Sequence, residues 1–187
     1  DNNQDDGTKP RELVTTALDI LMAQGFDFTR LSRDASGYIR AMNIFYAGEC
    51  ASGWSLGLWP HSWNINPKLV DAANGIFASR YQMSDMGAEM YIGTFCHENG
   101  HMVCGYPDLY SYLNGSSIVG RYSLMAASGS THPGHVDPYL KMKSGWADIQ
   151  EVGSATHAYG LLQEDRNFFY KHTNPANSRE YFLVENR

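Results

Sequence analysis

The segment from Met90 to Val103 is apolar and long enough for about three to four turns of helix, yet three ionisable side chains interrupt it. They are His97, Glu98 and His101, in the pattern His-Glu-Xaa-Xaa-His. Unpaired polar groups are costly to bury, so we expect these side chains to have partners. The Gly-Tyr-Pro sequence at 105–107 is typical of a helix end. The segment therefore predicts a helix that holds a polar site inside the protein.

The spacing of the three residues is typical of a metal site. Residues four apart lie on one helix face, about one turn (~5.4 Å) apart, so His97 and His101 can direct both imidazoles at one zinc ion. Glu98 lies at the neighbouring edge of that face, where it can take a proton from a zinc-bound water without ligating the metal. Two unrelated surface histidines and a glutamate can produce the same pattern. The apolar setting favours the catalytic interpretation.

A zinc ion of this kind needs a third protein ligand, with water in the fourth position. The glycine–proline exit from the helix lets the chain turn sharply, which would carry Asp108 back below the metal. A turn or capping role is the alternative for this residue. Glu185 is the main competitor for the third position, with His132 and His135 behind it.

Length and composition indicate a single domain over residues 1–187. The net charge is −6, and no lysine- or arginine-rich run occurs, which argues against nucleic acid or an anionic membrane surface as the partner. No apolar stretch approaches the ~20 residues of a membrane-spanning helix. The polar, acidic start does not resemble a signal peptide, so a secreted protein would begin here after processing. The oligomeric state stays open.

The three cysteines are Cys50, Cys96 and Cys104. Their odd number fits one disulfide with a free thiol, or three thiols. Cys96 and Cys104 would lie about 12 Å apart in a continuous helix, whereas a disulfide needs α-carbons within ~7 Å. These two are therefore not paired with each other unless the helix breaks, and Cys50 could pair with either.

The remaining chain predicts a mixture of helices, strands and loops. The expected elements are a helix over residues 10–25, strands over 38–47 and 75–83, loops over 48–66 and 108–130, a helix over 136–146, and strands over 167–170 and 181–184. The strand over 75–83 has the mixed alternation of an edge strand, which could add an extended peptide. Arg187 follows the last strand directly, so truncation of the domain at its C-terminus is left open.

Calcium is a further cofactor that the sequence leaves open without indicating it. The turn over 34–37 resembles a calcium loop only in Asp34, whereas such a loop needs acidic groups at alternate positions. We expect an ordinary glycine turn there.

Residues 97–110 resemble the active-site segment of the immune inhibitor A family of secreted zinc metalloendopeptidases, which belong among the metzincin-like zincins. Further segments that match in family order are 58–63, 122–129, 137–146 and 180–187. The resemblance implies an α+β metzincin-like catalytic domain with a twisted mixed sheet, an active-site helix and a Met-turn. It also implies an extracellular location.

The resemblance implies metal-ligand roles for His97 and His101, a catalytic role for Glu98, and a Met-turn role for Met125, which would lie beneath the metal. A core methionine that fills a gap is the alternative for Met125. The commoner family spacing places a glycine three residues, and the third ligand six residues, after the second histidine. Here the glycine and Asp108 come four and seven residues after it, which a helix one residue longer would explain.

The resulting hypothesis is a secreted zinc endopeptidase that hydrolyses peptide bonds of protein substrates through a zinc-bound water activated by Glu98. The alternatives are a catalytically silent zinc-binding domain that interacts with proteins, and a non-peptidase zinc hydrolase. The presence of Glu98 argues against the silent domain. Tyr110, Tyr122 and His132 are candidates for stabilising the oxyanion, and His132 and Tyr139 are candidates for lining the substrate pocket.

Overall fold

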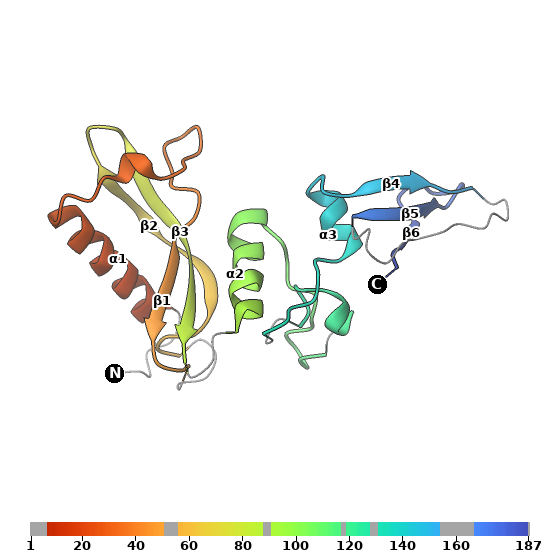
Figure 1. Cartoon of the computed structure of the whole chain (residues 1–187), viewed down its shortest axis with the longest axis horizontal. Coiled ribbons are helices and arrows are strands. Elements are labelled where there is room, and N and C mark those ends of the chain that lie inside the picture. The colour runs from red at the N-terminus through yellow and green to blue at the C-terminus, as the bar shows by residue number, and fades with distance from the viewer. Residues whose placement is uncertain are drawn as a thin grey trace.

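A computed structural model describes residues 7–50, 56–87, 91–116, 119–127, 131–153 and 167–186. Within these residues the chain forms three α-helices and two three-stranded mixed sheets (Figure 1). The expected α+β class is confirmed. The β-strands form two small sheets, one on each side of the central helix in Figure 1, where the sequence led us to expect one.

The first sheet has the order β1-β3-β2 and is covered by helix α1. Strand β1 (Asn43–Ala47) pairs parallel with β3 (Ile76–Met86), and β2 (His61–Asp71) pairs antiparallel with β3. Helix α1 (Thr8–Ala23) confirms the helix expected at the N-terminus, and a 3-10 turn follows at Phe28–Arg30. The buried side chains of this core are Val14, Leu18, Phe28, Ile39, Met42, Tyr46, Ile65, Val70, Ile76, Ala78, Tyr81 and Met83.

The prediction that residues 75–83 form an edge strand is wrong. Strand β3 lies in the middle of the sheet, because β2 pairs with its other side. The sequence led us to expect a loop over most of 48–66, since the polar residues and Pro67 obscure the alternation of β2. The register of β2 against β3 shifts between Asn64 and Lys68, which accommodates the proline. The outer edge of the sheet therefore belongs to β2.

Helix α2 (Ile92–Cys104) packs on β2 and β3. It ends at Gly105, whose left-handed backbone (φ 66°) turns the chain away. The helix thus includes Cys104 before it turns, as the altered spacing of the sequence led us to expect. All three cysteines are free thiols, so neither Cys96 nor Cys104 is paired with Cys50.

The C-terminal part consists of helix α3 and the second sheet, with a 3-10 turn at Gly120–Tyr122 before them. Helix α3 (Pro138–Lys143) is shorter than the expected helix and begins at the capping carboxylate of Asp137, which accepts from the amide of Leu140. The second sheet has the order β4-β5-β6, formed by Asp148–Glu151, Phe168–Thr173 and Tyr181–Val184. The two expected C-terminal strands are confirmed as an antiparallel pair, and β4 was not predicted.

A second core lies between α2 and α3. Its buried members are Tyr106, Leu124, Met125 and Leu140, and Cys96 and Cys104 of α2 pack against them. One side of α2 therefore faces the first sheet and the other side faces this core (Figure 1).

The turn at Asp34 uses its carboxylate within the chain. Its Oδ1 accepts hydrogen bonds from the amides of Ser36 and Tyr38, at 2.9 and 3.0 Å. These contacts are those of an Asx turn.

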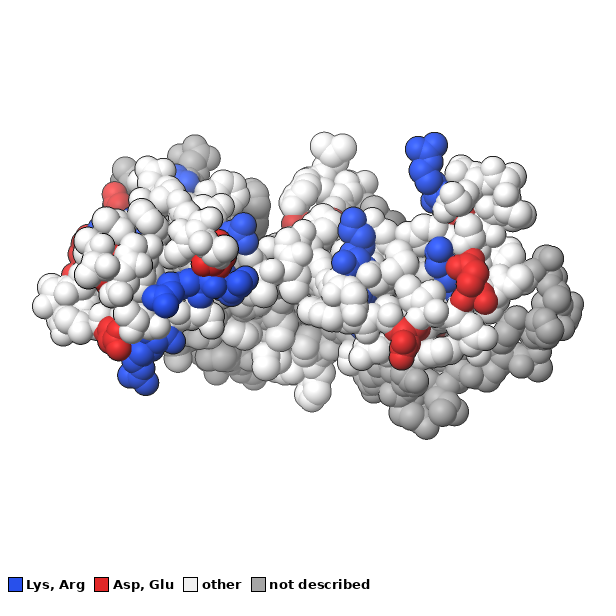
Figure 2. Space-filling view, turned by 90° about the horizontal axis from the view of Figure 1, so that it is seen from above, with Lys and Arg blue, Asp and Glu red and all other residues white. Residues whose placement is uncertain are grey.

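The surface carries its charges in small groups. On the face in Figure 2, basic and acidic side chains are scattered over an otherwise uncharged surface. In the part of the chain that the structure describes, each helix is too short or too polar to cross a membrane.

Two glycines give a matched test of the first sheet. Gly37 and Gly25 both have a positive φ, but a β-carbon at Gly37 would lie 2.3 Å from the carbonyl oxygen of Gly75, whereas nothing lies within 4 Å at Gly25. We expect Gly25→Ala to lower the free energy of unfolding by about 1 kcal/mol, the cost of a left-handed alanine. Gly37→Ala should lower it by roughly 3 kcal/mol or more, because the backbone of the β3 start must move. Urea unfolding measures both, and equal losses would contradict the packing described here.

Candidate metal centre

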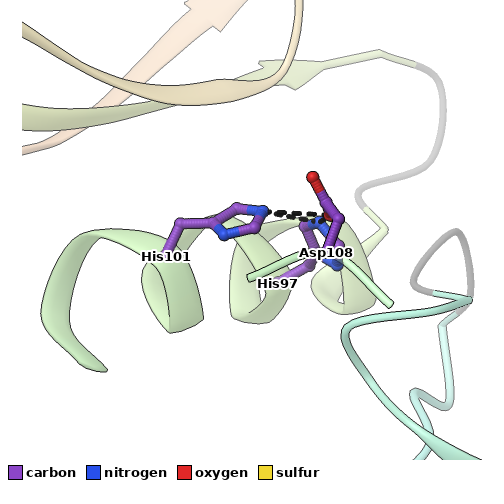
Figure 3. A group of neighbouring side chains, drawn as sticks. All are labelled: His97, His101 and Asp108. Carbon is purple, nitrogen blue, oxygen red and sulfur yellow. Dashed lines mark hydrogen bonds and ion pairs between the residues drawn. The ribbon is translucent and has the colours of Figure 1, made fainter. Parts of the chain in front are cut away.

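Three side chains converge at the C-terminal half of α2. His97 and His101 extend from one face of the helix, and Asp108 returns to them from the loop that follows Gly105 (Figure 3). The Nε2 atoms of the two histidines lie 3.0 Å apart. Oδ1 of Asp108 lies 2.9 Å from Nε2 of His97 and 3.2 Å from Nε2 of His101. This group could hold a metal ion.

Hydrogen bonds to the backbone orient both imidazoles. Nδ1 of His97 donates to the carbonyl of Leu124 at 3.0 Å, and Nδ1 of His101 donates to the carbonyl of Tyr106 at 2.6 Å. A neutral imidazole that donates from Nδ1 carries a lone pair on Nε2. Both lone pairs therefore point to the same place, as a shared metal ion requires.

The separations fit a bound cation. Three electron-rich atoms lie about 3 Å from one another. Ligands at about 2.0–2.1 Å around a tetrahedral ion are separated by roughly 3.3 Å, close to these values. Oδ1 of Asp108 is buried and forms no hydrogen bond of acceptable geometry within the described residues. Such an atom is costly to bury unless it meets a positive charge. Two imidazoles and one carboxylate are ligands that zinc accepts.

A proton competes for the same atoms. Burial lowers the pKa of His97 and His101, but the Asp108 carboxylate, the backbone carbonyls that accept from the two rings and the charge of Glu98 together raise the pKa of both imidazoles. Burial likewise acts to raise the pKa of Asp108, and the nearby imidazoles and the Tyr112 hydroxyl lower it strongly. The carboxylate is therefore ionised and available to a cation at neutral pH.

The geometry favours Asp108 over its competitors for the third position. Nζ of Lys141 lies 3.5 Å from Oε1 of Glu185, and the two side chains are only 6% and 8% exposed. Glu185 therefore compensates the charge of Lys141, away from the two histidines. Neither His132 nor His135 belongs to the ligand group found among the described residues.

Two tyrosines flank the carboxylate. The hydroxyl of Tyr112 donates to Oδ2 of Asp108, which leaves Oδ1 directed at the histidines. The ring of Tyr110 stacks along that of His97 at 6.4 Å between centroids. The hydrogen bond to Asp108, aided by burial, raises the pKa of Tyr112 to about 12. This tyrosine thus keeps its proton and fixes the orientation of the carboxylate.

Glu98 lies beside the ligands but is not one of them. It is buried, and its carboxylate accepts a hydrogen bond from the backbone amide of Ser62 in β2. Burial raises its pKa, although the two nearby imidazoles lower it in part. The elevated pKa makes this carboxylate a better proton acceptor than an exposed one.

Met125 packs against α2 at Gly100. It is fully buried, and a β-carbon at Gly100 would lie 2.8 Å from its sulfur. The preceding residue, Leu124, provides the carbonyl that accepts from His97. The absence of a side chain at Gly100 thus allows the thioether to lie against the helix.

A pocket of about 720 Å³ opens onto the site. Its walls come from the outer edge of β2, from α2, and from the loop after Gly105. The residues that line it are Gly7, Trp59, Pro60, His61, Ser62, Trp63, Asn64, Arg80, His97, Glu98, His101, Met102, Gly105, Asp108, Tyr110 and Tyr112. Tyr110 is the one oxyanion candidate among them, since Tyr122 and His132 lie elsewhere. Tyr139 also lies outside this set.

His61 is a buried histidine at the rim of β2. Its Nδ1 lies 2.6 Å from the carbonyl of Trp59, and its Nε2 lies 2.9 Å from the hydroxyl of Tyr81. Burial, aided by the charge of Arg11, lowers its pKa to about 4. It is therefore neutral at pH 7 and joins the β2 edge to the first core.

Sequence reasoning missed Tyr112, His61 and the amide of Ser62. Tyr112 lies four residues after Asp108, but no periodic element links the two. The positions of His61 and Ser62 follow from the pairing of β2, a strand that the sequence did not predict.

No family model matches the sequence, and a search of the curated proteins finds no match.

Replacement of Tyr112 tests the orientation of the third ligand. Tyr112→Phe removes the donor to Asp108, so we expect zinc to bind about tenfold more weakly. The matched control is Tyr139→Phe, which removes a hydroxyl from an exposed tyrosine outside the pocket. Competition with a zinc-sensitive dye measures both affinities. Equal affinities in wild type and Tyr112→Phe would show that this hydrogen bond does not position the ligand.

His61 makes stability depend on pH. Its folded pKa of about 4 lies below the usual histidine pKa of 6.5, so the unfolded state binds more protons as pH falls. Its contribution is complete above pH 6.5 and is lost between there and pH 4, about 3 kcal/mol in all. His61→Asn should therefore lose less stability than wild type between pH 7 and pH 4.5. Urea unfolding with a chelator, which removes metal effects from both proteins, measures this difference, and parallel pH profiles would contradict it.

Proposed function

We propose that this chain is a zinc-dependent endopeptidase of the metzincin-like type, similar to the immune inhibitor A family, and that it acts outside the cell. The observation that carries the proposal is the convergence of His97, His101 and Asp108 beside the buried carboxylate of Glu98 in one pocket. A metal-binding group without an adjacent base would support only a binding role.

His97, His101 and Asp108 would hold the zinc ion. When bound, zinc supplies Lewis acidity for a carbonyl oxygen and lowers the pKa of a water molecule. The chain's contribution is to orient the ligands. The carbonyls of Leu124 and Tyr106 fix the two imidazoles, and Tyr112 fixes the carboxylate.

Glu98 serves as the general base. Glu98 lines the pocket, and the backbone amide of Ser62 on β2 holds its carboxylate in place. The carboxylate takes the proton of the attacking water and holds it at a carboxyl oxygen. It then delivers the proton to the leaving amine, because a raised pKa suits both steps near neutral pH.

The outer edge of β2 supports a peptide as the substrate. The pocket is lined by Trp63 from one face of this strand and by Ser62 and Asn64 from the other, so it runs along the edge itself. An exposed edge offers amide and carbonyl groups that an extended peptide can pair with. A site open along a strand edge accepts the middle of a chain, which favours an endopeptidase.

Tyr110 is suited to stabilise the oxyanion of the tetrahedral intermediate. It lines the pocket beside the ligands. Burial, with the charge of Asp108 nearby, raises its pKa, so the hydroxyl stays protonated and can donate.

The contacts of Met125 support the Met-turn part of the proposal. The fully buried thioether lies against Gly100, between the histidines, and Leu124 beside it holds His97. Packing of this kind keeps the floor of the site dry and rigid.

Replacement of Glu98 distinguishes a peptidase from a catalytically silent zinc-binding domain. Glu98→Gln keeps the size of the side chain but removes the proton acceptor, so zinc should stay bound while cleavage of casein falls at least 100-fold. His101→Ala should lose both zinc and cleavage, and Glu12→Gln, at an exposed glutamate on α1, should change neither. Metal analysis and casein hydrolysis measure the two properties. Retained cleavage in Glu98→Gln would overturn the mechanism.

A further inference from the structure

Arg80 stands out among the residues of the pocket by its charge. It is the one lysine or arginine among the described residues that line the pocket. Its side chain is exposed, and no described residue forms an ion pair or a hydrogen bond with its guanidinium. The other permanent charges of the pocket are the carboxylates of Glu98 and Asp108. Arg80 is therefore available to a ligand from outside the chain.

The sheet fixes where this charge lies along the pocket. Arg80 on β3 is directly opposite Asn64 on β2, so both side chains are on the same face of the sheet. Ser62 on β2 lies on that face too, opposite Gln82. Asn64 and Arg80 thus form a polar pair on the same face of the sheet as Ser62, two residues further along β2.

Ser62 also marks the catalytic position, because its amide holds the carboxylate of Glu98. Two residues of a strand span about 6.6–6.8 Å, which is the distance from Ser62 to Asn64 along β2. An extended peptide paired with β2 has the same repeat. A peptide bond at Glu98 therefore brings the side chain about two residues away next to Asn64, with Arg80 one strand (~4.8 Å) further across the same face of the sheet.

The charges favour an acidic group at that place. The chain carries a net charge of −6, which on its own disfavours acidic peptides. A guanidinium with an amide beside it can bind a carboxylate through paired hydrogen bonds. An aliphatic or basic side chain would leave these groups without partners.

We propose that Arg80, assisted by Asn64, is a specificity-determining residue that selects peptides with a carboxylate side chain about two residues from the scissile bond. The assignment rests on the proposed peptidase function, because the substrate position is counted from Glu98.

The test uses quenched fluorescent peptides that carry glutamate or glutamine at each position from three before to three after the cleaved bond. At one position, about two residues from the cleaved bond, glutamate should give a kcat/KM about fivefold higher than glutamine with the zinc-loaded wild type. Arg80→Gln should abolish this preference, and Arg80→Glu should reverse it in favour of lysine at the same position. The preference should also weaken in 0.5 M salt.

The matched control is Arg30→Glu, which makes the same change of charge at an exposed arginine outside the pocket. This variant should keep the wild-type preference. If it loses the preference as Arg80→Glu does, net charge rather than position is responsible, and the assignment to Arg80 is overturned.

A binding measurement separates failure of this inference from failure of the proposed function. Fluorescence anisotropy with Glu98→Gln reports affinity for the same peptides without cleavage. Cleavage by wild type with equal rates for glutamate and glutamine at every position would overturn the role of Arg80 and leave the peptidase function standing. Absence of cleavage would overturn the peptidase function. In that case the role of Arg80 stands only if the protein still binds glutamate peptides more tightly than glutamine peptides and Arg80→Gln removes this difference. Equal affinities for the two peptides would overturn the role of Arg80 as well.

Discussion

Two hydrogen bonds from imidazole nitrogens to backbone carbonyls determine how the centre of this protein is organised. His97 donates to Leu124 and His101 donates to Tyr106, so each ring is tied to a different loop. The first bond holds Met125 against α2, and the second holds the chain that delivers Asp108. If either carbonyl moved, the lone pairs on Nε2 would no longer share a target.

Helix α2 belongs to two cores at once. Phe95 stacks on Phe45 of the first sheet at 5.5 Å, while Cys96 and Cys104 pack into the second core. The free thiols thus serve as small apolar groups. A helix packed on both sides has little freedom to rotate, which keeps its ionisable face directed at the pocket.

The sequence was informative wherever a feature depends on neighbours along the chain. The bounds of α2, its exit at Gly105 and the return of Asp108 all follow from local spacing and glycine geometry. The outer strand β2 was missed because polar residues and a proline disrupt its pattern, and its assignment depends on pairing with β3. The choice between Asp108 and Glu185 was equally beyond local reasoning, since Glu185 is engaged by Lys141 from another element. Likewise, no sequence pattern connects Glu98 with the amide of Ser62.

The three side chains that could hold a metal ion come from a stretch of 12 residues, from His97 to Asp108. Closing so short a loop costs little chain entropy, so α2 and its C-terminal turn bring the three side chains together, and the carbonyl of Leu124 then orients His97. Glu98 is different, because its contact with Ser62 joins positions far apart in the chain and requires the first sheet to be in place. The candidate metal group and the position of Glu98 therefore depend on separate parts of the fold. Loosening the sheet would leave the three side chains of the candidate metal group together but would release the carboxylate of Glu98.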